Sequence, residues 1–560
     1  MIKKIISALN LVSACACFVI GALLSIELGF DVSVENRELF SRMHTVLILY
    51  FLADTLCRIL LSKNIKNTIL SRILDALLII PLVGKGVPGL PLFDNYLVVQ
   101  ILLLFVMMGR LPHVNGLFRK LKFNPAQIFL IGFLLAIIIG SLFLSLPLSR
   151  SIDTHLSFID AIFTATSAIC VTGLVTQDIG YAFSGFGQSI ILVLIQLGGI
   201  GIMTFYALLT IVLNRKMSHN ETSEYQETLL SDSATHPFAV IKYIIGLTII
   251  LESIGVLLLF SFWKDDFESP IKAFLYAVFH SISAFCNAGF SLFPNSLAGY
   301  VDQPSILITI ALLIILGGIG FPVIFNIMNQ NFKHFQWRRL RVQTKIPIVV
   351  TSALILVGMV LIYFGESQNA LVDYGFKGKL LMSFFHSVSS RTAGFQAMSL
   401  TTFHVSTLWV LIILMFIGAS PGSTGGGIKT TTFGLMFASL RSTLQGESRV
   451  EWFGRTITMA NTFKAMSIIT VSLSTIGLFF YVLLWFEDLP FMSLLFEAIS
   501  AFGTVGFSLD VTPQLSTGGK VALIVLMFLG RVGPLTFAYA LSSRKPKPNY
   551  AYPEEKILLG

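Results

Sequence analysis

Runs of about twenty apolar residues recur along the whole 560-residue chain, and no stretch between them is long enough for a large soluble domain. A helix of about 20 mostly apolar residues crosses the hydrocarbon layer of a bilayer. Charged residues make up 12% of the chain, whereas soluble domains carry about 25%. The sequence therefore predicts an integral membrane protein that crosses the bilayer many times and is surrounded by membrane lipid.

Four short segments repeat one pattern: an aromatic residue, a small polar middle, and a Gly followed by Leu or Phe. They read FTATSAICVTGLVT from Phe163, FHSISAFCNAGFSL from Phe279, FHSVSSRTAGFQAM from Phe385 and FEAISAFGTVGFSL from Phe496. Their shared glycines, about 110 residues apart, are Gly173, Gly289, Gly394 and Gly506. Whole segments that recur at a fixed period indicate four copies of one structural unit.

Each short segment lies between two long apolar runs. The runs before it are 125–148, 238–262, 346–364 and 463–486, and the runs after it are 186–213, 306–328, 408–437 and 521–541. A helix of about a dozen residues cannot cross and return, so the segment is interpreted as a re-entrant helix with an extended return strand. The predicted fold is an all-α polytopic membrane protein with four helix–pore loop–helix repeats in a pseudo-fourfold arrangement.

Lys and Arg residues are concentrated on one side of this topology. The repeat junctions and the tail carry Arg215, Lys216, Lys333, Arg338, Arg339, Arg341, Lys345, Arg441, Arg449, Arg455, Lys464, Arg544, Lys545 and Lys547. The opposite loops carry fewer: Arg150, Lys264, Lys377, Lys379 and Lys520. Because cytoplasmic loops are enriched in Lys and Arg, the junctions are predicted to be cytoplasmic and the pore-loop glycines to lie near the outside. The net charge of +9 thus reflects topology and does not call for a nucleic-acid partner.

The first 122 residues stand apart from the repeats. They fit about four extra transmembrane helices at 5–26, 45–61, 73–83 and 97–108, an even number that returns the chain to the cytoplasm. A cleaved signal peptide is the alternative for the first of them, but that apolar run is long enough to span. The predicted units are 1–122, the pore repeats 123–216, 217–330, 331–440 and 441–545, and a cytoplasmic tail 546–560.

The four glycines fit a selectivity filter. A cation that leaves water needs its hydration shell replaced, and inward-facing backbone carbonyls can do this. Glycine accepts a positive φ, and the C-terminal end of a short helix directs partial negative charge at the ion. The predicted ligands are the carbonyls of Val171, Thr172, Gly173, Asn287, Ala288, Gly289, Thr392, Ala393, Gly394, Thr504, Val505 and Gly506. Packing glycines are the alternative, but packing does not explain why whole segments repeat.

The second apolar runs contain another repeated feature below the filter. They include LGGIG from Leu197, LGGIG from Leu316, IGASPGSTGGGIKTTT from Ile417 and LGRVGP from Leu529. The third cannot continue as regular helix, and irregular backbone at membrane depth must line protein or a water-filled cavity. We interpret it as an intramembrane gate, in preference to a simple kink, with the residues Gly418, Ser420, Pro421, Gly422, Gly425, Gly426 and Gly427.

Arg531 stands in the fourth repeat where the other repeats have Gly199, Gly318 and Ala419. An intramembrane Arg normally faces the protein interior or water. Two compatible roles follow: its charge can oppose a cation below the filter, and its donors can anchor carbonyls that the broken third helix leaves free. Lys429, further along the third run, is interpreted as a residue that snorkels toward the cytoplasm.

Several other ionisable residues lie near the pore loops. Arg391, just before the third filter segment, would repel a cation, so it is expected to pair with a carboxylate, either Glu497 or Glu252. His280 and His386 begin pore helices and are interpreted as hydrogen-bonded packing residues. The five cysteines have no metal-ligand spacing, so no disulfide, zinc site or bound cofactor is expected.

Five motifs, CVTGL, CNAGF, RTAGF, GTVGF and GRVGPLTF, are specific when taken together. In them, and over about residues 120–545, the chain resembles the Trk/Ktr/HKT superfamily of potassium transporters. The resemblance implies potassium (K⁺) uptake across a bacterial plasma membrane, a homodimer and a cytoplasmic nucleotide-binding regulatory subunit, with Na⁺ left open as an activator. Some plant members that transport sodium carry Ser at the first filter Gly, so Gly173 favours potassium. The extension 1–122 departs from the family pattern.

A sodium- or proton-coupled secondary transporter is the alternative, because broken helices occur in that class too. It would need an intramembrane carboxylate that binds the coupling ion, and Glu252 is the one strong candidate. An enzyme is not expected, because the chain has no metal cluster, nucleophile motif or phosphate loop.

Overall fold

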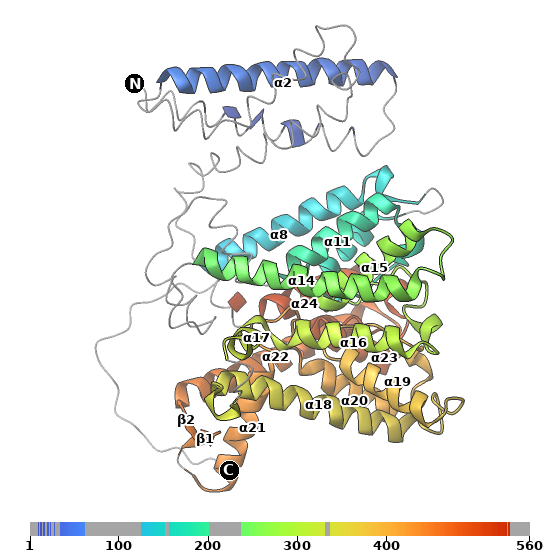
Figure 1. The fold of residues 1–560 in the computed structure, drawn as a ribbon, viewed down its shortest axis with the longest axis vertical. Coiled ribbons are helices and arrows are strands. Elements are labelled where there is room, and N and C mark those ends of the chain that lie inside the picture. Colours follow the sequence, from blue (N-terminus) through green and yellow to red (C-terminus); the bar gives the residue numbers. More distant parts are fainter. Residues whose placement is uncertain are drawn as a thin grey trace.

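The computed structural model describes residues 34–61, 125–151, 156–200, 237–330, 336–447 and 449–534, with single residues between 9 and 27 and at 536–537. Within these ranges the chain is largely helical, and the helices of the repeats pack side by side in one bundle (Figure 1). The predicted spans 73–83 and 97–108 lie outside the described residues. So do the predicted topogenic residues Arg215, Lys216, Lys333, Arg544, Lys545 and Lys547.

Each repeat contains the three predicted parts. The first helices are α8 (Pro125–Leu144), α14 (Pro237–Trp263), α18 (Val342–Glu366) and α22 (Met459–Phe486). The pore helices are α9 (Phe158–Ile169), α15 (Pro270–Phe285), α19 (Phe376–Ser389) and α23 (Phe491–Gly503). The second helices begin as α11 (Gly185–Gly199), α16 (Pro304–Ile319), α20 (Val405–Phe416) and α24 (Thr517–Val532). The pore helices are 12–16 residues long, too short to cross a bilayer.

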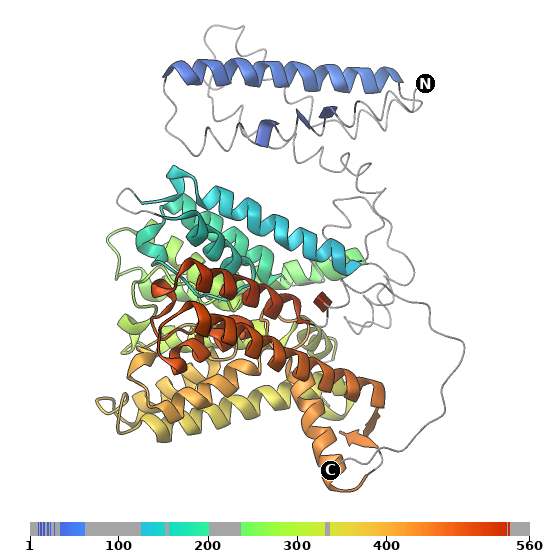
Figure 2. The same cartoon turned by 180° about the vertical axis from the view of Figure 1, so that it is seen from behind.

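The repeats close into a ring in chain order. Each second helix packs against the pore helix of the next repeat: α11 on α15, α16 on α19, α20 on α23, and α24 on α9. The last contact joins the fourth repeat to the first. Figure 2 shows the fourth repeat in red, between the first repeat in cyan and the third in yellow to orange. This arrangement agrees with the predicted all-α fold.

Apolar side chains cover the outside of the bundle. Leu135, Leu257, Val360 and Leu478, one from each first helix, are all exposed. The last turns of the pore helices are buried instead, including Ser167, Ser283 and Ser500. Large exposed apolar surface around buried polar side chains is unfavourable in water and suits hydrocarbon. The side-chain distribution therefore fits a bundle that stands in a bilayer.

Within the described residues the second helices of the second, third and fourth repeats are interrupted, whereas the sequence predicts a break in the third repeat alone. In the fourth repeat, α24 ends at Val532 and Gly533 has φ +86°, so the predicted continuous run 521–541 is wrong. The run 306–328 forms α16 and α17 (Phe321–Met328), which meet at an angle of 91°. Gly320 between them has φ +97°, a left-handed conformation that a right-handed helix cannot contain. The expectation of one continuous helix is therefore wrong. In the third repeat, α20 and α21 (Thr430–Leu444) are separated by irregular backbone, as predicted.

The N-terminal part is described mainly by α2 (Val34–Leu61), which lies apart from the repeats in both views (Figures 1 and 2). It begins eleven residues before the predicted span 45–61, so that boundary is wrong. The polar residues at its start can remain helical outside the hydrocarbon layer. The apolar part, Leu39–Leu60, is long enough to cross a bilayer.

The remaining elements are short. They are α10 (Ile179–Ala182), the 3₁₀ turns Pro147–Ser149, Ala298–Tyr300, Trp337–Arg339, Leu400–Thr402 and Thr512–Gln514, and strands β1 (Val450–Trp452) and β2 (Arg455–Ile457). The two strands form an antiparallel hairpin after α21, with Trp452 opposite Arg455. This hairpin is a small departure from a purely helical fold.

An ion pair joins the fourth repeat to the first. Lys520 Nζ of α24 lies 2.7 Å from Asp160 Oδ1 of α9, and both side chains are largely buried. Burial alone would raise the pKa of Asp160, but the hydrogen bonds from Lys520 and Ser157 and the Lys520 charge lower it below its usual value of 3.8. The pair therefore stabilises the closed ring at neutral pH, and its contribution is lost as the pH falls below about 4.

Lys520→Met and Asp160→Asn are each expected to lower the thermal stability of the purified protein. In a double-mutant cycle we expect a coupling free energy of about 0.5–3 kcal/mol. Lys377→Met, which removes an exposed lysine from α19, is the matched control and should leave the melting temperature unchanged. Additive single-mutant effects would mean that this ion pair does not stabilise the ring.

Candidate ion pathway

The four filter segments share one backbone conformation. The first residue of each has a left-handed φ: Val171 +57°, Asn287 +60°, Thr392 +72° and Thr504 +51°. The filter glycines are left-handed as well: Gly173 +91°, Gly289 +70°, Gly394 +74° and Gly506 +93°. The residue between them keeps a negative φ. Left-handed backbone is unfavourable for Val and Thr and persists where the surroundings hold it.

The filter glycines contact one another around a closed ring. A Cβ at Gly173 would lie 2.5 Å from Ala288 O, one at Gly289 2.4 Å from Ala393 O, one at Gly394 2.2 Å from Val505 O, and one at Gly506 2.3 Å from Thr172 O. Real Cβ atoms essentially never come within 3.0 Å of such atoms. The ring thus runs from repeat one through four and back to one. Its four backbones are too close together for any side chain larger than that of glycine.

A serine near the end of each pore helix supports the filter backbone. Ser167 Oγ and Ser500 Oγ accept hydrogen bonds from the amides of Gly173 and Gly506, both at 3.1 Å. Ser283 Oγ and Ser389 Oγ instead donate to the carbonyls of Phe290 and Phe395, at 2.8 and 2.7 Å. These serines are not among the predicted site residues. The repeated small polar middle of the four segments is the signal that could have identified them.

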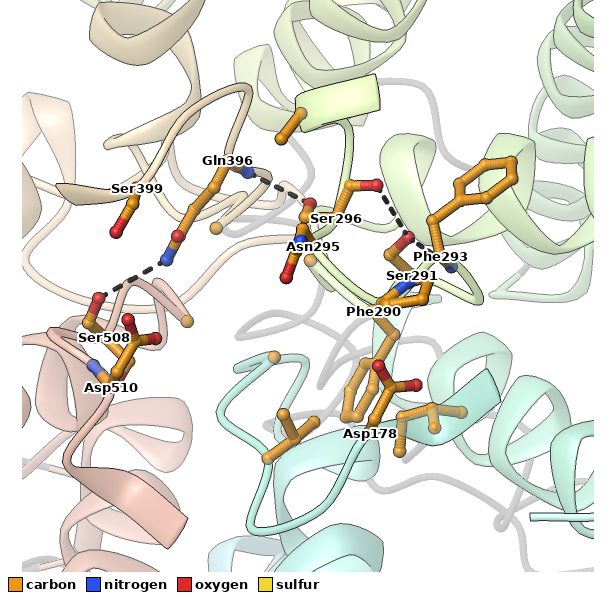
Figure 3. A pocket seen from close by; sticks show the side chains of 18 of the residues that line it. Asp178, Phe290, Ser291, Phe293, Asn295, Ser296, Gln396, Ser399, Ser508 and Asp510 are labelled. Atoms are coloured by element: carbon orange, nitrogen blue, oxygen red, sulfur yellow. Dashed lines mark hydrogen bonds between the residues drawn. The ribbon is translucent and has the colours of Figure 1, made fainter. Parts of the chain in front are cut away.

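A cavity of about 410 Å³ opens on one side of the ring. We call it the vestibule. Its lining includes all four filter glycines together with Asp178, Ser291, Ser296, Gln396, Ser508 and Asp510. Figure 3 shows these polar side chains around the cavity, with contributions from the first to the fourth repeat. The carboxylates of Asp178 and Asp510 give the vestibule a negative potential that attracts cations.

The irregular segment 417–429, here called the gate loop, lies against the other end of the filter. Gly426 N donates a hydrogen bond to Thr504 Oγ1 at 3.1 Å. A Cβ at Gly425 would lie 2.1 Å from Thr392 Oγ1. Thr392 also shares a hydrogen bond of 3.2 Å with the side chain of Asn287. The gate loop is therefore in direct contact with the first residues of two filter segments.

The gate loop is also bonded to the second repeat. Ser420 N and Thr424 N donate to the carbonyls of Gly318 and Gly317, at 3.0 and 3.3 Å. Phe321 N, at the start of α17, donates to Gly422 O at 3.0 Å. A Cβ at Gly320 would lie 2.6 Å from Pro421 O. The broken helices of the second and third repeats therefore meet, and the bend at Gly320 leaves space for the gate loop.

Among the predicted gate residues, the structure brings Ser420, Pro421, Gly422, Gly425 and Gly426 into these contacts. Gly422 and Gly427 have left-handed φ values of +66° and +67°, and a Cβ at Gly418 would lie 2.3 Å from Gly426 O. Ile417 and Ile428 pair through a parallel bridge. The two ends of the loop therefore lie side by side, and the loop itself stays inside the bundle.

Three buried or partly buried cationic side chains donate to gate-loop carbonyls: Arg531, Lys429 and Arg391. Arg531 donates to Thr424 O and to Gly198 O of the first repeat. Lys429 Nζ donates to Gly425 O at 2.7 Å. The interpretation of Lys429 as a snorkelling residue is therefore wrong: it precedes α21, and its side chain reaches back to the loop. The predicted contact of Arg531 with the gate loop is present.

Arg391 does not pair with either predicted carboxylate. Its guanidinium donates to Gly418 O of the gate loop at 3.2 Å. Glu497 instead accepts hydrogen bonds from Ser508 Oγ and, at 2.9 Å, from Thr512 Oγ1. In the part of the chain that the structure describes, Arg391 forms no ion pair.

Glu252 lies buried in α14 between the first two repeats. Its carboxylate accepts from Gln196 Nε2 at 3.3 Å and from Cys286 Sγ at 3.7 Å. The described residues place no Lys or Arg in an ion pair with it. Cys286 directly precedes the filter residue Asn287. Glu252 is therefore close to the second filter segment but outside the ring.

The two pore-helix histidines are hydrogen-bonded packing residues, as predicted, but they lie in the second halves of α15 and α19 and not at the helix starts, so their predicted placement is wrong. His280 Nδ1 bonds to Tyr276 O at 2.8 Å, and its Nε2 bonds to Ser291 Oγ at 3.0 Å. His386 Nδ1 bonds to Met382 O at 2.9 Å. Both imidazoles are fully buried and packed among aromatic rings.

Comparisons with known proteins identify the family. The family model TrkH, described as a cation transport protein, matches residues 137–552. Ktr system potassium uptake protein B from Bacillus subtilis is 38% identical over 445 residues, which cover 79% of this chain and 98% of that protein. The potassium/sodium uptake protein NtpJ from Enterococcus hirae is 34% identical over 446 residues, which cover 78% and 98% of the two chains.

A solved structure has the same fold. The potassium transporter TrkH from Vibrio parahaemolyticus matches with a TM-score of 0.59 at 19% identity, over 85% of this chain and 96% of that chain. The family match begins at residue 137, so the predicted unit 1–122 lies outside it. The resemblance inferred from the five motifs is confirmed. This chain is an all-α polytopic membrane transporter that belongs to the TrkH family of cation transport proteins, with potassium uptake proteins of the Ktr system among its relatives.

Proposed function

We propose that this chain takes up potassium through its filter ring. The observation that carries the proposal is the closed contact of Gly173, Gly289, Gly394 and Gly506, four equivalent glycines that approach through bare backbone. Such a ring can replace the hydration shell of a cation with carbonyl oxygens. The predicted ligands are the carbonyls of the three filter residues in each repeat, and potassium is the transported ion rather than a resident cofactor.

The proposed direction of entry is from the vestibule to the gate loop. Asp178 and Asp510 would concentrate cations in the vestibule, and dehydration would occur at the ring. The pore helices add the negative ends of their dipoles from four sides. The gate loop would then block the exit, because Gly425 and Gly426 lie against the inner filter residues Thr392 and Thr504. Uptake requires the loop to move away from this position.

Several finer proposals rest on membership of the family. We propose a homodimer in the bacterial plasma membrane, controlled by a cytoplasmic nucleotide-binding subunit. The loop that includes Arg338, Arg339, Arg341 and Lys345 is a candidate contact for that subunit, although a topogenic loop explains its charge equally well. Sodium is proposed as an activator, because one relative is named a potassium/sodium uptake protein.

Coupled secondary transport is the second candidate function. A buried carboxylate without a basic partner is either protonated or bound to a cation, and among the described residues Glu252 has no basic partner. Coupling through Glu252 would make uptake by the wild type depend on a sodium or proton gradient, and Glu252→Gln would remove that dependence. We expect instead that Glu252→Gln keeps the same dependence on both gradients as the wild type, measured as initial uptake rates.

The test of the proposed function is growth of a potassium-uptake-deficient bacterium at limiting potassium. The full chain is expected to restore growth, alone or with the regulatory subunit of a Ktr system. A chain that reaches the membrane and supports no potassium uptake under either condition would contradict the proposal. Sodium uptake measured in the same cells would then identify a different transported ion.

A further inference from the structure

A chain of hydrogen bonds runs along the wall of the vestibule. It begins in the fourth pore helix at Glu497, passes through Ser508, Gln396, Ser296 and Ser291, and ends in the second pore helix at His280. We call these six residues the vestibule belt. Figure 3 shows its middle part, in which Gln396 reaches toward Ser508 on one side and Ser296 on the other.

The two ends of the belt occupy equivalent positions. Glu497 and His280 each follow the aromatic residue that begins the repeated segment, and Ser508 and Ser291 each stand two residues after the filter glycine. The belt therefore fastens the return strand of the filter to its own pore helix in the fourth and second repeats. Glu497 and His280 are fully buried, so neither end can exchange its partners for bulk water.

Gln396 connects the two ends across the third repeat. It stands two residues after Gly394, the position of Ser508 and Ser291. Its backbone amide donates to Ser296 Oγ at 3.1 Å, and its carbonyl accepts from Leu297 N at 2.8 Å. Its side-chain Nε2 donates to Ser508 O at 3.5 Å, and the Ser291 Oγ contact with Ser296 O is equally long. The long contacts are the weaker links of the belt.

The backbone conformation beside the belt indicates that the belt has a structural role. Ser296 has a left-handed φ of +54° and Asp510 one of +61°. These conformations are unfavourable for residues other than glycine and persist where neighbouring contacts hold them. Ser296 is itself a member of the belt, and Ser508 Oγ, another member, accepts a hydrogen bond from Asp510 N at 3.0 Å. The belt thus holds the strained residues at the outer mouth of the filter.

We propose that Gln396 and Glu497 are positioning residues for ion selection. They do not touch the ion. They hold the return strands of repeats two, three and four at fixed separations, so that the outer carbonyls of the filter keep a spacing that suits potassium. The inference rests on the proposed potassium pathway. The inference assigns a selectivity role to Gln396, which lines the vestibule, and to Glu497, which lies buried behind that lining.

The experiment measures initial uptake of potassium and sodium into uptake-deficient cells that carry the full chain. The variants are Gln396→Leu, Ser296→Ala and Glu497→Leu, with the membrane amount and melting temperature of each recorded. The loss of one hydrogen bond of the belt is expected to lower the potassium-over-sodium ratio about fivefold. Glu497→Gln retains an oxygen that can accept a hydroxyl donor, so it should restore much of the ratio lost in Glu497→Leu.

Ser399→Ala is the matched control. Ser399 also lines the vestibule, but its hydroxyl bonds to Thr401 Oγ1 within its own turn, so the ratio should stay at the wild-type value. Ser296→Ala removes only one hydroxyl, so the inference can still be tested if the larger substitutions prevent folding. If belt variants that reach the membrane at the wild-type amount keep the wild-type potassium-over-sodium ratio, the selectivity inference is overturned and the proposed function still stands. A wild type that takes up no alkali cation would overturn the proposed function as well.

Discussion

Gly173→Ser is expected to lower the preference for potassium over sodium about tenfold or more, which corresponds to about 1.4 kcal/mol. A Cβ at Gly173 would lie 2.5 Å from Ala288 O. Its φ of +91° is a backbone conformation that residues other than glycine rarely adopt. The first filter segment must therefore shift away from the second. A ring with one displaced carbonyl matches the hydration energy of potassium less well, so sodium should compete better.

The measurement is the initial rate of potassium uptake with and without competing sodium, at equal membrane amounts of protein. Gly246→Ala is the control, because no atom lies within 4 Å of a Cβ at this position of α14, and it should match the wild type. Gly506→Ala places a Cβ 2.3 Å from Thr172 O. It should also lower the preference for potassium over sodium, because it displaces the fourth filter segment from the first. Wild-type selectivity in both filter variants would contradict the filter proposal.

Arg531→Ala is expected to raise potassium uptake in the absence of a regulatory subunit about fivefold or more. Arg531 joins Thr424 O of the gate loop to Gly198 O of the first repeat. Its removal takes away both hydrogen bonds and the positive charge below the filter. The loop should then leave its closed position more often, and the electrostatic barrier to a cation should fall.

Arg531→Lys separates the two roles of this residue. Lysine keeps the charge, but its single ammonium cannot reproduce the planar fork of the guanidinium. If the charge barrier dominates, the lysine variant should remain as closed as the wild type. If the anchoring of the loop dominates, it should leak nearly as much as Arg531→Ala. Uptake equal to the wild type in both variants, at normal expression, would mean that Arg531 does not control the gate.

Periodicity and composition were sufficient to predict the repeats. The four segments around Gly173, Gly289, Gly394 and Gly506 recur with their whole context, and apolar runs of spanning length on either side leave one arrangement for each copy. The break in the third repeat was predictable for the same reason, because its glycines and Pro421 exclude a regular helix. These features depend on local backbone preference and on the bilayer, and both can be read from a single chain.

The partners of buried polar groups could not be predicted in this way. Arg391 was expected to meet a carboxylate, yet it donates to Gly418 O, and Glu497 binds Ser508 and Thr512 instead. A charge alone does not determine its neighbour, because backbone carbonyls freed by a broken helix compete with carboxylates for the same donors. Lys429 and Arg531 donate to such carbonyls too.

The sequence by itself determined the membrane class, the four repeats with their shared glycines and the broken third helix, because each depends on residue types at short or regular spacing. Only the tertiary structure decided the order of the ring, the bend at Gly320, and the vestibule belt from Glu497 to His280. These features join residues far apart in the chain, as in the contact of Gly426 with Thr504, 78 positions away, or of Gln396 with Ser296, 100 positions away. Such contacts form only after the repeats pack, since no local preference specifies which distant backbone groups will meet.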